Sequence, residues 1–253
     1  LYAQDAGLGK RRLNPISMAI AQMALLPRSP LDGSVQIRCP GMGSPVFSGL
    51  SSLGQVDAYR GESGYDVVID CRGLTKLRRF HSVREARGLK KGLKALPFVA
   101  GKVSSALIIG SGAGIDVLAG IVAGVPKITA VEVNPLVIQA TETLARADGI
   151  YNVYDHEAVD LTVREGRAFV NASPDTYDLI YVPGSKLVGI SAYLLRENYL
   201  HTKEAFVSYL RHLNEHGMLA VGLKVFAEWV MATVVTTLLE EGLDPTKRTI
   251  LIT

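Results

Sequence analysis

The chain has 253 residues, of which 48% are hydrophobic and 20% are charged, and its net charge is +3. This length can bury a substantial hydrophobic core, and the composition excludes disordered, collagen-like and disulfide-scaffold proteins. The two cysteines, Cys39 and Cys71, lack the spacing of a metal site and allow at most one disulfide, which fits a reducing compartment. We therefore expect a globular protein of the cytoplasm.

Residues 1–47 are predicted to form an N-terminal extension. They combine an amphipathic segment at 16–26 with several glycines and with Pro27, Pro30, Pro40 and Pro45. The most hydrophobic window, residues 103–125, contains Asp116 and a glycine cluster, so it fits a buried strand and helix better than a membrane span. Because the chain begins at Leu1 rather than methionine, the sequence leaves open a targeting or membrane segment upstream of it.

Residues 48–100 are predicted to hold a small β-hairpin appendage followed by a basic linker. Residues 55–59 and 65–69 are rich in strand-forming side chains, and Gly61 and Gly64 bound a turn between them. The sequence therefore predicts two antiparallel strands in this region.

Positive charge is concentrated in the linker. Residues 1–105 contain 16 basic and 7 acidic side chains, whereas residues 106–253 contain 11 basic and 17 acidic ones. The cluster spans residues 72–94 and consists of Arg72, Lys76, Arg78, Arg79, Arg84, Arg87, Lys90, Lys91 and Lys94. It predicts either a solvated face or a surface for an acidic partner or an anionic membrane. Aromatic side chains are not interleaved with these charges as a nucleic-acid stacking platform requires.

Residues 101–253 are predicted to form an α/β domain with a doubly wound, mostly parallel sheet. Short apolar runs alternate with helix-length amphipathic segments, which is the pattern of successive βαβ units. The predicted strands are residues 106–109, 128–131, 158–163, 179–182, 218–222 and 249–252. Helices are predicted after the first five strands, among them residues 115–123, 135–147, 202–213 and 226–239. Such sheets bind ligands beyond the carboxyl ends of their strands.

A glycine-rich turn joins the first of these strands to its helix. In the sequence GSGAGID, the residues Gly110, Ser111, Gly112 and Gly114 precede Asp116. Glycines let the chain reverse tightly and let a ligand lie against the backbone, but close packing of a helix on a strand also requires them. The position of the third glycine departs from the dinucleotide fingerprint G-x-G-x-x-G, which disfavours a nicotinamide or flavin cofactor.

Carboxylates follow the next two strands. Glu132 and Val133 lie 22 and 23 residues after Gly110, where a carboxylate can accept hydrogen bonds from both ribose hydroxyls. Glu165 and Gly166 follow the third strand, where an adenine edge would lie, although an acid there also stabilises the start of a helix. Three strand ends therefore suit a nucleoside, and an adenosyl ligand without a pyrophosphate fits the turn best.

Six sequence blocks resemble the spermidine and spermine synthase-like proteins, which are polyamine aminopropyltransferase-like and share the class I S-adenosylmethionine-dependent methyltransferase fold. The blocks are residues 52–57 with 67–70, 108–114, 128–134, 165–169, 177–180, and 197–202 with Phe206 and 216–219. The resemblance implies a Rossmann-like sheet and a ligand such as S-adenosylmethionine, its decarboxylated form or methylthioadenosine. It also implies that the glycine turn holds the methionine portion, that Glu132 holds the ribose and that Glu165 faces the adenine.

The same resemblance carries expectations about assembly and extent. Family members commonly form homodimers, and related bacterial chains often carry a membrane-embedded part upstream. The fold normally ends with an antiparallel strand beside the sixth strand, whereas this sequence stops as the sixth would finish. We therefore expect the domain to be truncated before its last strand.

The chain departs from the family pattern at positions that bear on catalysis. Pro183 follows the fourth strand, where polyamine synthases carry the aspartate that deprotonates the attacking amine, and Ala113 stands in place of an acid. Where the family has the acids and tyrosines that cradle the diamine, this chain has Arg78, Arg79, Arg84, Lys90 and Lys91. Because two like charges 4 Å apart oppose each other by roughly 1 kcal/mol even in water, transfer to putrescine is disfavoured.

Few residues qualify as a catalytic base. Tyr199 and His201 are the candidates, because they lie beside the loop after the fourth strand. Tyr181, Ser185 and Tyr199 are candidates for lining an acceptor pocket, although Tyr181 also suits the core. Asp178 begins the fourth strand, at the end of the sheet away from ligands, and is predicted to be structural. No histidine spacing indicates a metal site.

Three functions remain open from the sequence. The first is a methyltransferase-like transferase that binds S-adenosylmethionine and works mainly by proximity and orientation. The second is an aminopropyltransferase that uses the decarboxylated ligand. The third is a non-catalytic interaction module that kept the fold. The sequence does not identify the small-molecule acceptor.

Overall fold

The computed structural model describes residues 39–71, 73–183, 199–222 and 228–248. The chain divides into two compact units, Leu1–Gly41 and Met42–Thr253, and the helices and strands described below belong to the second unit. The amphipathic segment predicted at 16–26 and the strand predicted at 249–252 lie outside the described residues.

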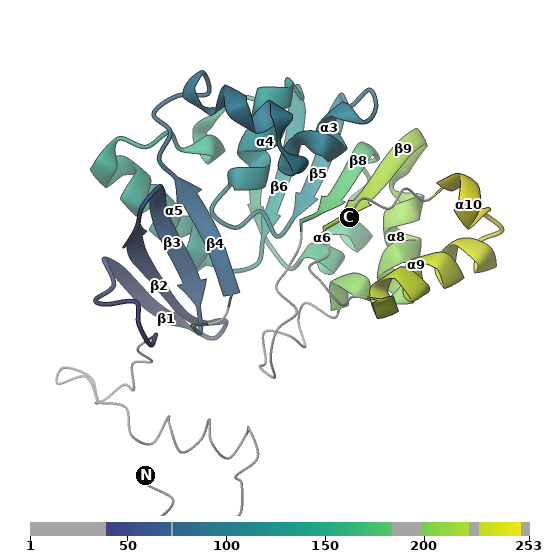
Figure 1. Cartoon of the computed structure of the whole chain (residues 1–253). Coiled ribbons are helices and arrows are strands. Elements are labelled where there is room, and N and C mark those ends of the chain that lie inside the picture. The colour runs from purple at the N-terminus through teal and green to yellow at the C-terminus, as the bar shows by residue number, and fades with distance from the viewer. Residues whose placement is uncertain (1–38, 72, 184–198, 223–227, 249–253) are drawn as a thin grey trace, which may run out of the picture. The chain divides into compact units, whose positions relative to one another are not determined.

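The first sheet has four antiparallel strands in the order β1-β2-β3-β4 (Figure 1). The strands are β1 (Phe47–Ser51), β2 (Gly54–Gly61), β3 (Gly64–Ile69) and β4 (Gly73–Arg78). The predicted hairpin corresponds to β2 and β3, whose register pairs Gly61 with Gly64 across the turn. The structure adds β1 and β4 to the predicted pair, and β4 lies in the segment predicted as basic linker because it forms a strand only through its pairing with β3.

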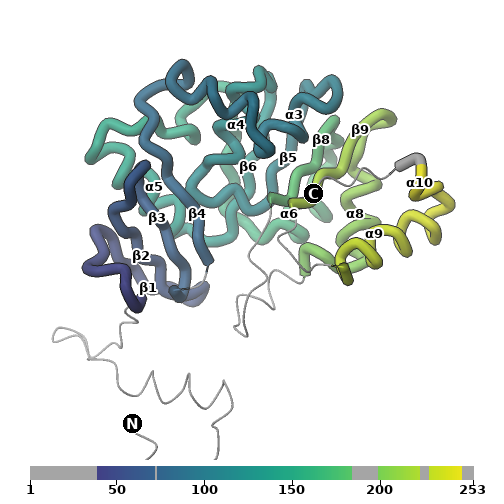
Figure 2. Tube along the Cα trace, in the orientation of Figure 1, coloured from purple at the N-terminus to yellow at the C-terminus, as the bar shows by residue number. Residues whose placement is uncertain are grey.

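One face of this sheet packs on a helix of the main domain. Val56, Ala58 and Val67 on β2 and β3 are fully buried, because alternate side chains of a strand point to the same face. They form one core cluster with Val137 and Ala140 of α5 (Pro135–Asp148). Figure 2 shows the small sheet beside α5. The antiparallel sheet is therefore anchored to α5 by apolar contacts.

The basic linker after β4 folds into short helical turns. These turns are η1 (Glu85–Lys91), η2 (Leu93–Ala95) and α3 (Leu96–Val99). They lie against α4 (Ile115–Ala123) through buried side chains such as Ala86 and Phe98. The charged side chains Arg84, Arg87, Lys90, Lys91 and Lys94 stay exposed.

The main sheet is parallel, with the order β7-β6-β5-β8-β9. Its strands are β5 (Ser105–Ile109), β6 (Lys127–Glu132), β7 (Val159–Val163), β8 (Tyr177–Val182) and β9 (Leu213–Val221). They confirm the first five predicted strands. Ile108 and Leu107, on opposite faces of β5, belong to two different core clusters, so the sheet is covered on both sides. The chain order reverses beside β5, which creates the crevice where ligands bind in such folds.

Helix α4 and Ile138 of α5 pack on one face of the main sheet, and helices from later in the chain pack on the opposite face. The remaining short and long helices are η3 (Val153–Asp155), α6 (Gly166–Ala172), η4 (Tyr199–His201), α8 (Lys203–Arg211), α9 (Glu228–Glu240) and α10 (Pro245–Arg248). Local capping sets several starts: Asn134 Oδ1 accepts from Leu136 N, and Thr202 Oγ1 accepts from Ala205 N. Within the described residues, none of the helices has the length and apolar character needed to cross a bilayer.

Candidate functional site

A cavity of about 630 Å³ opens at the carboxyl ends of β5, β6 and β8, where the strand order reverses. Its volume is in the range of small-molecule sites, which is roughly 300–1,000 Å³. The turns after β5 and β6 form one wall, the turn after β7 forms a second, and β4 with η1 and η2 forms a third. The small antiparallel sheet and the main sheet thus enclose the site together.

The glycine turn between β5 and α4 combines the two roles that the sequence left open. Gly110, Gly112 and Gly114 have φ angles of +80°, +59° and +86°, which other residues rarely adopt. A Cβ on Gly110 would meet nothing within 4 Å, whereas one on Gly112 would lie 2.5 Å from Thr75 Oγ1. A Cβ on Gly114 would lie 2.3 Å from Val153 Cγ2. Gly110 therefore keeps the cavity open, and the other two glycines permit close packing.

Gly114 does not belong to the cavity wall. Gly110, Ser111, Gly112 and Asp116 line the cavity, whereas Gly114 is the N-cap residue of α4 and packs on η3. The Val153 side chain fills the space beside Gly114, so no contact with the cavity supports the prediction that Gly114 binds the ligand.

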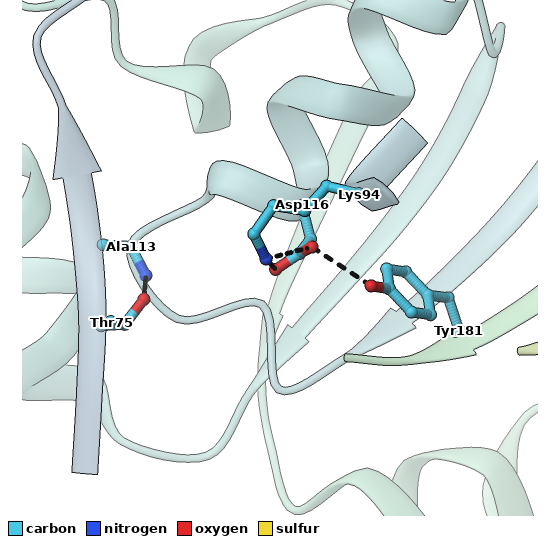
Figure 3. A network of polar contacts seen from close by, with 5 residues as sticks. All are labelled: Thr75, Lys94, Ala113, Asp116 and Tyr181. Atoms are coloured by element: carbon cyan, nitrogen blue, oxygen red, sulfur yellow. Dashed lines mark hydrogen bonds and ion pairs between the residues drawn. The ribbon is translucent and has the colours of Figure 1, made fainter. Parts of the chain in front are cut away.

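Thr75 joins the small sheet to the glycine turn. Its Oγ1 accepts a hydrogen bond from Ala113 N at 2.9 Å, and Figure 3 shows this contact between β4 and the turn before α4. The backbone of the turn is therefore held from a strand that lies about 40 residues earlier in the chain.

Glu132 is buried at the end of β6 and lines the cavity. Its Oε2 accepts from Gly112 N at 2.8 Å, and its Oε1 accepts from Asn134 N at 2.9 Å. Burial raises the pKa of this carboxyl, and the backbone N–H donors partly oppose that rise. Each oxygen of a carboxylate has a second lone pair, so both remain able to accept from a ligand hydroxyl.

Polar neighbours of Glu132 complete this wall. Val133 and Asn134 line the cavity, and the buried Asn134 Nδ2 has no hydrogen-bond partner among the described residues. The Tyr154 hydroxyl lies 3.0 Å from Ser111 Oγ and donates to Gly112 O at 2.6 Å. Burial raises the pKa of Tyr154 far above its ordinary value, so this phenol stays protonated and donates a hydrogen bond.

Asp116 is engaged by two partners at the start of α4, as Figure 3 shows. Lys94 Nζ lies 2.8 Å and 3.0 Å from its two carboxylate oxygens, and the Tyr181 hydroxyl donates to Oδ1 at 3.3 Å. Burial and the neighbouring Asp116 raise the pKa of Tyr181. Asp116 and Lys94 both line the cavity, while Tyr181 is a buried strand residue, in agreement with its predicted core position.

Glu165 lines the cavity at the end of β7 and also caps a helix. Its Oε1 accepts from Arg167 N at 3.0 Å, and its Oε2 accepts from Ala168 N at 2.7 Å. The helix-start role that the sequence allowed is therefore present. Gly166 and Arg164 line the same wall, and the Arg164 side chain is exposed.

The predicted catalytic bases do not line the cavity. Tyr199 is 59% exposed, and His201 is 2% exposed and packs against the Phe206 and Trp229 rings. Leu200, between them, is the residue of η4 that lines the cavity. Tyr199 and His201 therefore lie outside the cavity wall, and a catalytic role for either residue stays a prediction.

Pro183 lines the cavity directly after β8, and Ser185 lies outside the described residues. Asp178 accepts from Ser104 N, Ser105 N and Asn214 Nδ2 at the opposite end of the strand, so its predicted structural role is confirmed.

Neither cysteine has a free thiol. In the described part of the chain, no three histidine, cysteine or acidic side chains lie close enough to hold a metal ion.

Sequence reasoning missed several cavity residues. Thr75 and Lys94 lie in the region predicted as hairpin and basic linker and carry no local signal of a site, because only the fold brings β4 and η2 to the glycine turn. The pair Asn134-Pro135 is typical of a helix start, so it could have indicated that Asn134 lies beside Glu132, but this prediction was not made.

No protein-family model matches this sequence, and no curated protein matches it. Among solved structures, the fold is similar to a spermidine synthase in complex with the transition state analogue AdoDATO, with a TM-score of 0.57 and 16% identity. It is also similar to the spermidine synthase of Thermotoga maritima, with a TM-score of 0.57 and 17% identity. Each similarity covers 79% of this chain and 64% of the other. The chain therefore has a spermidine synthase-like fold, of the class I methyltransferase type, and spans about 64% of the length of those synthases.

Proposed function

We propose that this chain binds an S-adenosyl sulfonium nucleoside and acts in the transfer of an alkyl group from its sulfur. The observation that carries the proposal is the pairing of an open Gly110 with a buried Glu132 in one cavity at the switch point of the sheet. The similarity in fold to spermidine synthases supports it.

In this proposal, the ribose lies over the turn after β6. The Glu132 carboxylate is held by Gly112 N and Asn134 N, so it is presented to a ligand in one orientation. A carboxylate fixed in this way accepts hydrogen bonds from two vicinal hydroxyls without loss of side-chain freedom on binding. The adenine then lies towards Arg164 and Glu165, and the chain of the sulfonium lies against Gly110.

The transfer requires little chemistry from side chains. The acceptor's nucleophilic atom forms a bond to the carbon beside the sulfur, and the electron pair of the breaking C–S bond returns to sulfur. The cationic sulfonium becomes a neutral thioether, and any proton on the nucleophile leaves to solvent. Pro183 cannot serve as a base, so we infer that alignment of the two reactants supplies the acceleration.

Two transferred groups remain candidates, each supported by a different observation. Aminopropyl transfer from the decarboxylated ligand is favoured by the identity of the structural neighbours, which are spermidine synthases. Methyl transfer from S-adenosylmethionine is favoured by the pairing of Lys94 with Asp116, because Lys94 offsets a carboxylate beside the glycine turn that would otherwise attract the cationic decarboxylated chain. Ala113 adds to this, because it places no carboxylate where the cationic decarboxylated chain would lie.

Calorimetry with S-adenosylmethionine, its decarboxylated form and methylthioadenosine tests the proposal on the wild-type chain and on Glu132→Gln. We expect at least one of the three to bind, and the glutamine variant to bind it about tenfold more weakly, because one acceptor becomes a donor. Glu142→Gln, which changes an exposed acid of α5, is the matched control and should bind as the wild type does. Failure of all three ligands to bind would reject the proposal and leave an interaction module.

A turnover assay then separates binding from catalysis. Incubation with a labelled sulfonium ligand and candidate acceptors should release the labelled group from sulfur. The ligand that is consumed identifies the transferred group, whereas tight binding without consumption assigns the chain a non-catalytic role.

A further inference from the structure

We propose that the co-substrate sharing this cavity carries a negative charge, as a carboxylate or a phosphate, and is not a polyamine. This inference rests on the proposed function, since it names the class of acceptor that would receive the transferred group. It concerns the end of the cavity formed by β4 and the turns η1 and η2.

Cationic side chains dominate this end of the cavity. Lys76 and Arg78 line it from alternate positions of β4, so they lie on the same face of the strand, and Lys94 lines it from η2. Leu74, Leu89 and Leu93 provide the apolar surface between them. The three cations are exposed, but they gather on one wall of the cavity.

At the β4 end of the cavity, the charge of Arg78 is left uncompensated among the described residues. Its Nη1 donates to the neutral Ser63 hydroxyl at 2.9 Å, and among the described residues it forms no ion pair. Lys76 pairs with Asp66 on the neighbouring strand at 2.9 Å, but both side chains remain partly exposed, so this pair is readily exchanged. A guanidinium binds a carboxylate or phosphate through two parallel hydrogen bonds.

The acids of the cavity are already engaged. Asp116 is paired with Lys94, Glu132 accepts from two backbone nitrogens, and Glu165 caps α6. Of these, only Asp116 is near the β4 end, and Lys94 offsets its charge. The described residues therefore offer a diamine no uncompensated carboxylate at this end, while they offer an anion at least one guanidinium.

Electrostatics then separates the two classes of acceptor. A cation placed near Arg78 is repelled and an anion is attracted, and both effects are stronger in a partly enclosed site than in bulk water. Putrescine has two ammonium groups, and the positive charge at this end of the cavity repels both of them. The anionic group serves as a recognition handle, and the nucleophilic atom is elsewhere on the same co-substrate.

The test measures binding to protein saturated with methylthioadenosine. Succinate, inorganic phosphate and putrescine are titrated in turn, and the anion that binds more tightly distinguishes a carboxylate site from a phosphate site. We expect succinate or phosphate to bind, putrescine to bind more weakly than either, and Arg78→Gln to weaken anion binding about tenfold. Arg79→Gln is the matched control, because Arg79 is the next residue and lies outside the cavity wall, near Tyr65 and Asp148.

Two outcomes overturn the inference: putrescine binding more tightly than both anions, or anion binding that Arg78→Gln leaves unchanged. Thermal melting of both variants confirms that they are folded. If methylthioadenosine itself does not bind, the nucleoside proposal fails, and the same anion titrations on nucleoside-free protein still decide whether the β4 end selects anions.

Discussion

The carboxylate of Glu132, at the end of β6, accepts a hydrogen bond of 2.8 Å from the backbone nitrogen of Gly112, in the turn after β5. Its other oxygen holds Asn134 N, at the start of the connection to α5. One side chain therefore positions the turns that follow two neighbouring strands. Its contribution to loop geometry and its contribution to ligand binding must be separated by experiment.

The first prediction concerns the pH dependence of stability. Burial raises the pKa of Glu132 in the folded protein, so the unfolded chain ionises first as the pH rises. The stabilisation that arises from this raised pKa is fully present below the pKa that Glu132 has in the unfolded chain. It is lost as the pH rises through the pKa that Glu132 has in the folded protein. We expect the stability of Glu132→Gln relative to wild type to increase as the pH rises from about 4 towards 8. Urea unfolding of both proteins across that range measures it, and a difference independent of pH would contradict the raised pKa.

The second prediction compares two glycines with similar backbones. Gly110 and Gly124 have φ angles of +80° and +90°, and a Cβ on either would meet nothing within 4 Å. Alanine at each position should cost about 1–2 kcal/mol from backbone strain. Only Gly110→Ala should also lose affinity for methylthioadenosine, because Gly110 lines the cavity and Gly124 does not. Equal affinities of the two variants would show that the ligand does not lie against Gly110.

The third prediction concerns the link between the small sheet and the glycine turn. Thr75→Val keeps the side-chain shape but removes the acceptor of the Ala113 N–H group. We expect a loss of about 1–3 kcal/mol in the free energy of unfolding, because a part-buried donor is left without a partner. Thr75→Ser retains the hydroxyl and should lose less. If valine and serine are equally tolerated in urea unfolding, the hydrogen bond does not contribute to stability.

The fourth prediction concerns the ion pair between Lys94 and Asp116. A double-mutant cycle with Lys94→Met and Asp116→Asn should give a coupling energy of about 1 kcal/mol, since Asp116 is buried and Lys94 is half-exposed. The coupling should shrink as salt is added. The exposed pair of Lys203 and Glu240 is the control, and its coupling should be smaller. A coupling no larger than that of the control would mean that solvent screens Asp116 as well.

Local pattern was sufficient for much of the main domain. The helix predicted at 115–123 has the same limits in the structure, because glycines with positive φ bound it at both ends. The parallel strands were predictable because β5, β6 and β8 are covered on both faces and so read as continuous apolar runs. By contrast, β4 alternates exposed cations with buried residues such as Leu77, and its role as a strand depends on pairing with β3.

The sequence by itself determined the doubly wound architecture and pointed to Gly110 and Glu132, which line the cavity, because both properties depend on neighbours within one strand and its turn. Only the tertiary structure decided which glycines line the cavity, that Tyr199 and His201 do not line it, and that Lys76, Arg78 and Lys94 border it. The physical reason is that a cavity is enclosed by segments distant in the chain, and the direction of each side chain is set by what packs against it.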